Sequence, residues 1–128
     1  MNSYRDLKVW QRAMDLAVES YELTRSFPAS EAYGLNSQIK RAATSVPANI
    51  AEGYGRHSTG AYVQHLKIAQ GSLKELETHL LLSVRLSLVP ESRLKNAMML
   101  AEEIGKMLWS LIRSLQDERN GRTSDEKP

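Results

Sequence analysis

Side chains that could carry catalysis or hold a metal are few in this sequence and poorly grouped. Glu75 and His79 stand four residues apart, which places them on one face of a helix. Metal sites inside helical bundles use Glu-x-x-His on two helices together with two further glutamates, whereas here a longer spacing occurs once. We therefore expect His79 to be ion-paired or hydrogen-bonded, and we expect no metal.

Other catalytic patterns are also missing. Gly53-Tyr54-Gly55 resembles a fragment of a glycine-rich phosphate loop, but a helical pattern precedes it and no Gly-Lys-Ser/Thr follows. A helix end is the simpler interpretation. The chain has no cysteine, which excludes disulfides, thiolate metal sites and cysteine nucleophiles, and no Ser/His/Asp order or paired-carboxylate site stands out. We predict that the protein is not an enzyme and carries no cofactor.

The composition is typical of a folded globular chain. The 128 residues are 41% hydrophobic and 25% charged, which fits one domain with its own core. There is no run of about 18 apolar residues to span a membrane, and the first residues lack an apolar signal core, so we expect a cytoplasmic protein. The net charge of +2 and the pI near 9.0 permit nucleic-acid binding without requiring it.

Hydrophobic residues recur at spacings of three and four in long segments rich in Leu, Ala, Glu, Lys and Met, so the predicted fold class is all-α. Loop-forming residues divide the chain into four helices, predicted over residues 6–26, 31–54, 59–87 and 91–116. Ser30 and Ser58 are expected to cap the second and third helices, and Pro90 stands near the start of the fourth. The short connections favour an up-down-up-down antiparallel bundle over residues 1–116.

Two places depart from this simple pattern. Pro47 lies inside the second helix, where its ring and missing N–H predict a kink or bulge that leaves the carbonyl of Ala43 without its normal donor. The alternative is that Pro47 ends one helix and another begins nearby. The polar tail, residues 117–128, has no large apolar side chain to offset its ordering entropy, so it is predicted to be disordered.

Uncharged helix faces indicate that the bundle does not act as a monomer. Residues 42–51 (AATSVPANIA) carry no charge, residues 80–89 (LLLSVRLSLV) carry only Arg85, and the first helix has a second apolar face. Every helix of a four-helix bundle is peripheral, so burial within one bundle explains these faces poorly. Because large apolar patches on a monomer favour association, we expect a homo-oligomer.

Polar residues also form stripes on the second and third helices. Candidate members of a structural network between these helices are Ser45, Asn49, Glu52, Ser72 and Glu75, and His65 and His79 lie on the same stripe of the third helix. A buried polar group without a partner costs about 1–3 kcal/mol, so these groups should pair between helices or between subunits. The alternative is a solvated face on which Glu52 and Arg56 form an i,i+4 pair.

Three segments resemble one bacterial family. They are residues 6–10 (DLKVW), 41–56 (RAATSVPANIAEGYGR) and 68–78 (IAQGSLKELET). They are similar to the four-helix-bundle proteins encoded in intervening sequences of 23S ribosomal RNA genes, to which the accessory variability proteins of diversity-generating retroelements look related. The resemblance covers about residues 4–116. It implies a ring-like homopentamer without enzymatic activity, and the retroelement relatives bind nucleic acid and a reverse transcriptase.

Two functions stay open at this point. One is an oligomeric module that binds RNA or DNA through phosphates, with the candidate contacts Lys40, Arg41, Arg56, His57, Lys67, Lys74 and Arg85. Lys67, Lys74 and Arg85 share one stripe of the third helix, with no acid among them, over a rise of about 27 Å at about 1.5 Å per residue. The other function is a protein–protein scaffold that binds no nucleic acid.

Overall fold

The computed structural model describes residues 3–31 and 34–125. This part of the chain contains no strand and is all-α, as predicted. Its four α-helices are α1 (Lys8–Thr24), α2 (Leu35–Tyr54), α3 (Thr59–Arg85) and α4 (Lys95–Asp125). Three short 3-10 helices precede α1, α2 and α4, namely η1 (Tyr4–Asp6), η2 (Ala29–Glu31) and η3 (Glu91–Leu94).

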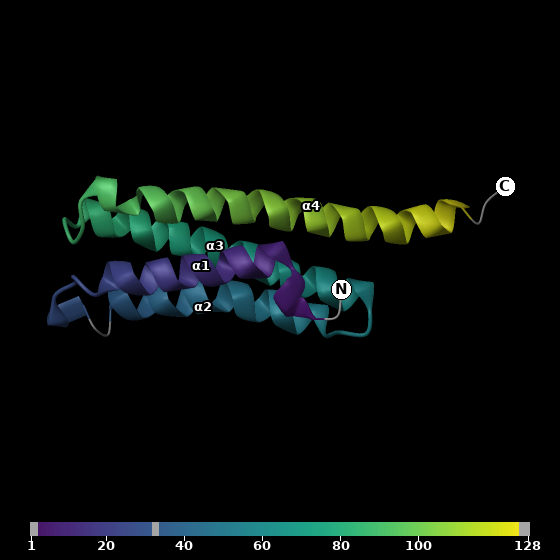
Figure 1. Cartoon of the computed structure of the whole chain (residues 1–128), viewed down its shortest axis with the longest axis horizontal. Coiled ribbons are helices and arrows are strands. Elements are labelled where there is room, and N and C mark those ends of the chain that lie inside the picture. Colours follow the sequence, from purple (N-terminus) through teal and green to yellow (C-terminus); the bar gives the residue numbers. More distant parts are fainter. Residues whose placement is uncertain (1–2, 32–33, 126–128) are drawn as a thin grey trace.

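The four helices lie side by side along the long axis of the molecule, and their connections lie at alternating ends (Figure 1). α1 packs against α2 and α4, and α3 also packs against α2 and α4, so each helix has two principal neighbours. The α2–α3 contact is the most extensive of the four. The edge formed by α1 and α2 therefore lies across the bundle from the edge formed by α3 and α4.

Each helix contributes one apolar stripe to a single core. The largest fully buried side chains come from all four helices and η3, and include Leu16, Ile39, Leu66, Leu94 and Leu108. Burying such a side chain stabilises the fold by about 1.5–3 kcal/mol. On α1 the buried stripe is the one that contains Val9, Leu16 and Leu23, which leaves Met14, Val18 and Tyr21, on the other apolar face of this helix, exposed.

The predicted caps have different outcomes. The Ser58 hydroxyl accepts a hydrogen bond from the backbone N–H of Ala61 at 3.1 Å and caps α3, as predicted. The Ser30 cap of α2 is wrong, because the chain first makes the 3-10 turn η2 and α2 begins after Gly34. The Glu31 carboxylate accepts instead from the backbone N–H of Leu35 at 3.4 Å, one of the donors left free at a helix start.

Pro47 lies inside an unbroken helix. α2 continues from Leu35 to Tyr54 with the buried Pro47 ring in it, so the alternative in which Pro47 ends one helix is wrong. Proline has no N–H to offer the carbonyl of Ala43, whatever the local curvature of α2. The kink or bulge itself stays a prediction.

The last helix continues beyond its predicted end. The sequence placed that end at Gln116 and predicted disorder over residues 117–128, but α4 is helical as far as Asp125, and residues 126–128 lie outside the described residues. An existing helix adds one hydrogen bond for each further residue without a new nucleation cost, so polar residues can extend it. An i,i+4 contact of 3.9 Å between Arg113 and Asp117 supports the extension.

In the described ranges, no helix combines the length and the apolar character needed to cross a lipid bilayer.

Candidate functional site

A row of apolar side chains stands exposed on α1. Met14, Val18 and Tyr21 follow one another at helical spacing, and Val18 is 61% exposed. We call these three residues the α1 stripe. The Lys40 ammonium of α2 lies 5.1 Å from the centre of the Tyr21 ring, so the stripe belongs to the α1–α2 edge of the bundle. The first helix has two apolar faces, and this stripe belongs to the one that lies outside the core, whereas the face predicted as the second, with Val9, Leu16 and Leu23, is the buried one.

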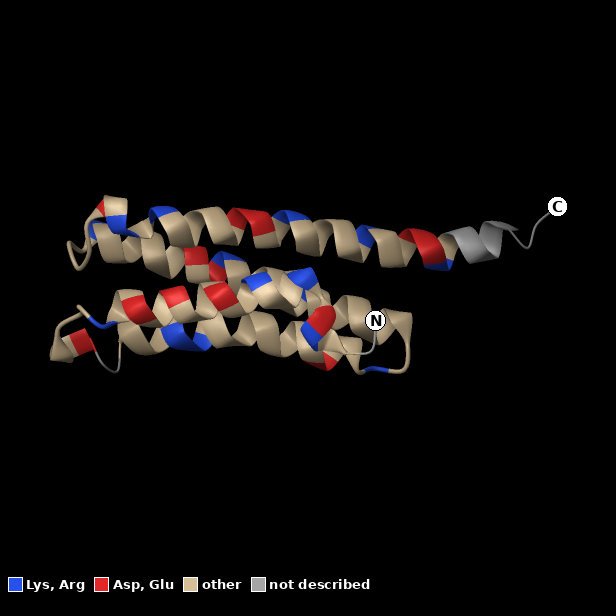
Figure 2. Cartoon of the chain, in the orientation of Figure 1, with Lys and Arg blue, Asp and Glu red and all other residues tan. Residues whose placement is uncertain are grey.

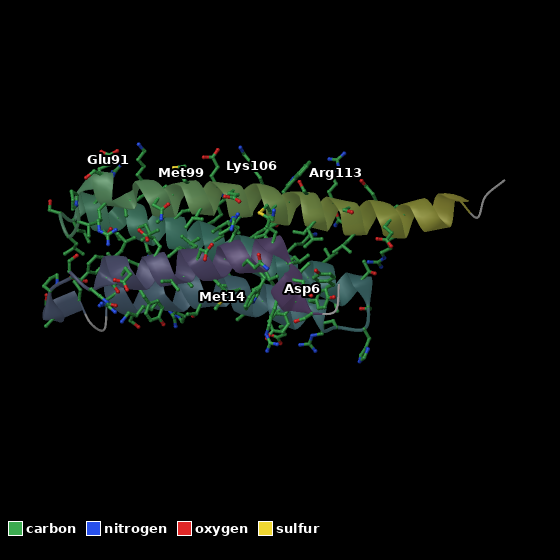
Figure 3. The ribbon with its side chains drawn as sticks, in the orientation of Figure 1. Asp6, Met14, Glu91, Met99, Lys106 and Arg113 are labelled. Atoms are coloured by element: carbon green, nitrogen blue, oxygen red, sulfur yellow. The ribbon has the colours of Figure 1, made fainter. Side chains whose placement is uncertain are left out.

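A groove runs between α3 and α4 on the far edge. Its volume is about 1520 Å³, and apolar side chains from both helices line it, including Leu73, Leu81, Met98, Met99 and Trp109. We call it the α3–α4 groove. Met99 is 62% exposed and Trp109 is 56% exposed. Figure 3 shows Met99 on the free edge of α4, with Met14 among the side chains near α1 and α2.

Two glycines hollow the α3–α4 groove. A Cβ atom on Gly71 of α3 would meet no other atom within 4 Å, and one on Gly105 of α4 would lie 3.6 Å from Leu73 Cδ2. Glycine inside a helix costs about 0.5–1 kcal/mol relative to alanine. The isolated fold therefore gains nothing from either glycine, whereas a partner that enters the groove gains space.

A chain of hydrogen bonds ties α2 to α3. The Ser45 and Ser72 hydroxyls are 2.8 Å apart. The Asn49 amide donates to the carbonyl and hydroxyl oxygens of Ser45, at 2.9 and 3.1 Å, and its own oxygen lies 3.2 Å from His65 Nδ1. Arg56 completes the chain by donating to His65 Nε2 at 3.2 Å and to the Glu52 carboxylate at 2.8 Å.

The bonds around His65 have one consistent set of donors and acceptors, whereas either hydroxyl can donate in the Ser45–Ser72 bond. Because Arg56 Nε can only donate, His65 Nε2 must accept, and the ring must be neutral with its proton on Nδ1. His65 Nδ1 then donates to the Asn49 oxygen, which leaves the Asn49 amide group to donate to Ser45. Every member therefore has its partner.

The two helices approach each other closely beside this network. A Cβ atom on Gly53 would lie 2.8 Å from His65 Cβ and 3.2 Å from the backbone oxygen of Tyr62. A glycine is required here because the neighbouring α3 backbone leaves no room for a side chain. The same approach places the Tyr54 and Tyr62 rings edge to face, with centroids 6.1 Å apart.

The half-buried Tyr62 hydroxyl has a shifted acidity. Burial, and secondarily the neighbouring Tyr54, raise the pKa of Tyr62 above 10.0. Both causes disfavour the phenolate, so Tyr62 is neutral at physiological pH and serves packing rather than acid–base chemistry.

The structure brings together four of the predicted network residues, Ser45, Asn49, Glu52 and Ser72, and adds two others to them. Glu75 is exposed and makes no hydrogen bond with them in the described part of the chain. Arg56 was predicted as a nucleic-acid contact, and the structure also makes it a member of this network. The spacing of seven between His65 and Ser72 was the signal that placed His65 on the same face of α3.

The candidate nucleic-acid contacts do not form one cluster. Lys40 and Arg41 lie near the start of α2, Arg56 and His57 lie in the α2–α3 turn, and Arg85 ends α3. Lys40 stacks on Tyr21, and Arg41 donates to the side-chain oxygen of Gln38 at 2.7 Å. Figure 2 shows acidic and basic positions interspersed along α4 and along the lower helices.

The stripe on α3 is less basic than predicted. Lys74 forms a 3.4 Å ion pair with Glu77, so the expectation of a stripe without acids is wrong. Sequence spacing placed Glu77 on a neighbouring face, but a lysine side chain is long enough to reach it. Lys67 and Arg85 are exposed and make no ion pair with any described residue. Lys67 and Lys74 also line the α3–α4 groove.

The described residues contain no candidate metal site. No group of three or more His, Cys, Asp or Glu side chains could hold an ion there. The expected partner of His79 is also missing, because both of its ring nitrogens are buried and neither has a hydrogen-bond partner among these residues. That expectation was wrong because the i,i+4 neighbour Glu75 is exposed instead of turning toward the ring.

The comparison with known proteins now gives the family. The model of the 23S rRNA-intervening sequence protein family matches residues 5–110. The chain belongs to this family. A solved structure similar to this member of the family is a protein of unknown function from the S23 ribosomal protein family of Bacteroides thetaiotaomicron VPI-5482. The two are 26% identical, with a TM-score of 0.73 over 81% of this chain and 97% of that one. No curated protein matches the chain.

Proposed function

We propose that this 23S rRNA-intervening sequence protein is a non-enzymatic protein that acts as a homo-oligomer. The assembly that the sequence resemblance implies is a ring-like homopentamer of up-down-up-down bundles. The observation that carries the proposal is the large apolar surface left open by the folded chain, on α1, α3 and α4. Exposed apolar patches that are rimmed by polar residues are typical of protein–protein interfaces.

The positions of the exposed apolar side chains favour self-association over a single copy that acts as a scaffold for a different protein. The exposed apolar side chains lie both on the α1–α2 edge, at Val18, and on the α3–α4 edge, at Leu81 and Met99. A single partner would need to cover only one of these edges. Copies of the same chain cover both, because each copy offers one edge to each neighbour.

Light scattering coupled to size-exclusion chromatography tests this proposal. A pentamer has a mass of 72 kDa, five times the 14.4 kDa of the chain. A species at 14.4 kDa at micromolar concentration would refute the oligomer.

Binding of RNA or DNA by the oligomer is the second candidate function, and the reverse-transcriptase partner implied by the resemblance belongs to it. The exposed guanidinium of Arg85, which has no ion-pair partner among the described residues, favours it, together with Arg41, whose guanidinium in the same part of the chain bonds to the neutral side-chain amide of Gln38. Repetition of these groups around an oligomer would add weak phosphate contacts into useful avidity. Binding through phosphates should tolerate any sequence and weaken steeply with salt.

Fluorescence anisotropy with a labelled single-stranded RNA tests this second function. Arg41→Glu combined with Arg85→Glu should weaken binding at low salt at least tenfold. The matched control, Arg5→Glu with Lys8→Glu, makes the same change of charge near the N-terminus. Equal weakening by both pairs, or no binding by the unmodified protein at low salt, would refute specific phosphate contacts.

A further inference from the structure

We propose that His65 is a pH-sensitive switch: its neutral ring binds Arg56 and ties the α2–α3 turn to α3, and its protonated ring releases Arg56. The α2–α3 turn is residues 55–58, between the end of α2 at Tyr54 and the start of α3 at Thr59. Histidine is the side chain whose charge ordinarily changes between about pH 5 and about pH 8. This inference concerns a single chain and does not depend on the proposed oligomer.

The neutral ring joins the turn to both helices. His65 Nε2 accepts from Arg56 Nε at 3.2 Å, and His65 Nδ1 donates to the Asn49 side-chain oxygen at 3.2 Å. Arg56 lies in the turn, Asn49 on α2 and His65 on α3. The guanidinium of Arg56 also binds Glu52, at 2.8 Å, but this bond stays on the α2 side of the turn. The bond to His65 is therefore the one that ties Arg56 to α3.

Protonation reverses the polarity of one of these contacts. A protonated imidazole donates from both ring nitrogens and accepts at neither. At the present 3.2 Å, the Nε2–H of a charged His65 would face the Nε–H of Arg56, which places two donors and two positive charges against each other. The bond to Asn49 survives, because Nδ1 donates in both states. Acid therefore breaks the contact with Arg56 and leaves the ring attached to α2.

The acid beside this contact cannot serve both cations. The Glu52 carboxylate is bound to Arg56 Nη2. If it turned to a protonated His65, Arg56 would lose its ion pair, and if it stayed, the two cations would remain adjacent. Both arrangements break the bond between Arg56 and His65. The 3-10 helix η1, which packs against α2, adds one charge of each sign, Arg5 and Asp6.

The other helices beside the ring bring positive charge. Residues 61–69 (AYVQHLKIA), which span one turn of α3 on each side of His65, contain no acid and one cation, Lys67. On α4, Arg119 approaches this end of α3, since a Cβ atom on Gly60 would lie 3.2 Å from Arg119 Nη1. Neither α3 nor this part of α4 therefore supplies an acid that would favour a charged ring.

Protons can reach the switch without opening the bundle. The side chains of Arg56 and Glu52 are 47% and 54% exposed, so the Nε2 edge of the His65 ring lies close to solvent. The neighbouring phenols of Tyr54 and Tyr62 do not take part, because phenols do not ionise between about pH 5 and about pH 8.

Hydrogen exchange with mass spectrometry measures the release of the turn. The backbone N–H groups of Gly55, Arg56, Ala61 and Tyr62 are all hydrogen-bonded, so exchange at these positions reports local opening. The full chain is compared at about pH 7.5 and about pH 5.5, with each rate divided by the intrinsic rate at that pH. We expect protection over residues 55–62 to fall about tenfold or more at the lower pH.

Two substitutions remove the switch from opposite sides. His65→Gln keeps a side-chain oxygen that can accept from Arg56 but carries no charge at either pH. Arg56→Gln removes the second cation and offers an oxygen to a protonated ring. Each variant should show the same protection at both pH values, to within about twofold. His57→Gln is the matched control, because His57 is an exposed histidine of the same turn, and this variant should keep the full change.

Three outcomes would overturn the switch. They are equal protection of the unmodified protein at both pH values, a full pH response in His65→Gln, and loss of the response in His57→Gln. His79 lies 14 residues further along α3, about 21 Å at about 1.5 Å per residue, so its titration should not act on the turn alone.

Nitrogen-15 NMR of the unmodified protein decides the case if neither glutamine variant folds. The geometry requires the proton of the neutral His65 ring to be on Nδ1. A proton on Nε2 at neutral pH would mean that the ring does not accept from Arg56, and would overturn the switch.

Discussion

The Ser45–Ser72 hydrogen bond is the contact of the polar network best suited to a quantitative test. It is 2.8 Å long, joins α2 to α3, and lies half-buried between them. Ser72→Ala removes this bond alone, whereas Ser45→Ala also removes the 3.1 Å bond from the Asn49 amide to the Ser45 hydroxyl and keeps the 2.9 Å bond to the Ser45 carbonyl. The double-variant cycle cancels this additional loss, because it occurs with and without Ser72.

The expected magnitude follows from counting this one bond. A neutral hydrogen bond is worth about 0.5–1.5 kcal/mol in net stability. Ser45→Ala and Ser72→Ala should each lose the bond, and the double variant should lose it only once. The coupling free energy between the two sites should therefore be about 0.5–1 kcal/mol, the lower half of that range because the site is partly solvated. The higher helix propensity of alanine affects both sites independently and cancels from the coupling.

Urea denaturation of the four proteins, at one fixed protomer concentration, measures this coupling. Thr44→Ala with Ser72→Ala is the control cycle, since the Thr44 hydroxyl bonds only to carbonyls of its own helix, at 3.0 and 3.2 Å. That control should be additive. A Ser45–Ser72 coupling within about 0.3 kcal/mol of zero, which is the additivity of independent sites, would mean that the network does not form.

Three further predictions concern the α2–α3 pair. Gly53→Ala places a Cβ 2.8 Å from His65 Cβ and should destabilise the fold by about 1–3 kcal/mol; Gly55→Ala, whose nearest contact would be 3.7 Å, should shift Tm far less. Ser58→Ala removes the cap of α3 and should cost about 1 kcal/mol in urea denaturation, and Thr59→Ala should cost less than Ser58→Ala if that cap is real. The pKa of Tyr62 is raised in the folded state, so above pH 10.0 the unfolded chain releases the phenol proton first. The contribution of Tyr62 to stability is therefore complete below pH 10.0 and is lost as pH rises through the raised value. Tyr62→Phe should reduce this alkaline loss of stability. An identical alkaline profile in Tyr62→Phe would contradict this assignment.

The sequence predicts those parts of the fold that depend on periodicity. Leu66, Leu73 and Leu80 recur at spacings that place them on one helix face, and all three are buried in α3. The Ser58 cap was predictable because its geometry depends on only a few neighbouring residues. The prediction of the Ser30 cap was wrong because residues 29–31 form a 3-10 turn before α2. The local sequence pattern does not show whether this turn or a helix capped by Ser30 is the more stable.

The site was less predictable because it depends on side chains from different helices. Periodicity predicted polar stripes on α2 and α3, but it could not tell which members meet: His65 bonds to Asn49, whereas Glu75 turns outward. The sequence contains no pattern that predicts the α3–α4 groove either, because Gly71 and Gly105 come together only when α3 packs against α4. The ion pair between Lys74 and Glu77 was not predicted, because the two residues lie on neighbouring faces of α3 and only the long lysine side chain brings the charges together.

Self-association through open apolar surface is the central claim, and sedimentation equilibrium of the unmodified protein tests it most directly. Val18 and Met99 lie exposed on opposite edges of the bundle, and assembly would cover both. We predict a single species near 72 kDa, five times 14.4 kDa, that persists to micromolar protomer concentration. A mass of 14.4 kDa over the same range would contradict the claim.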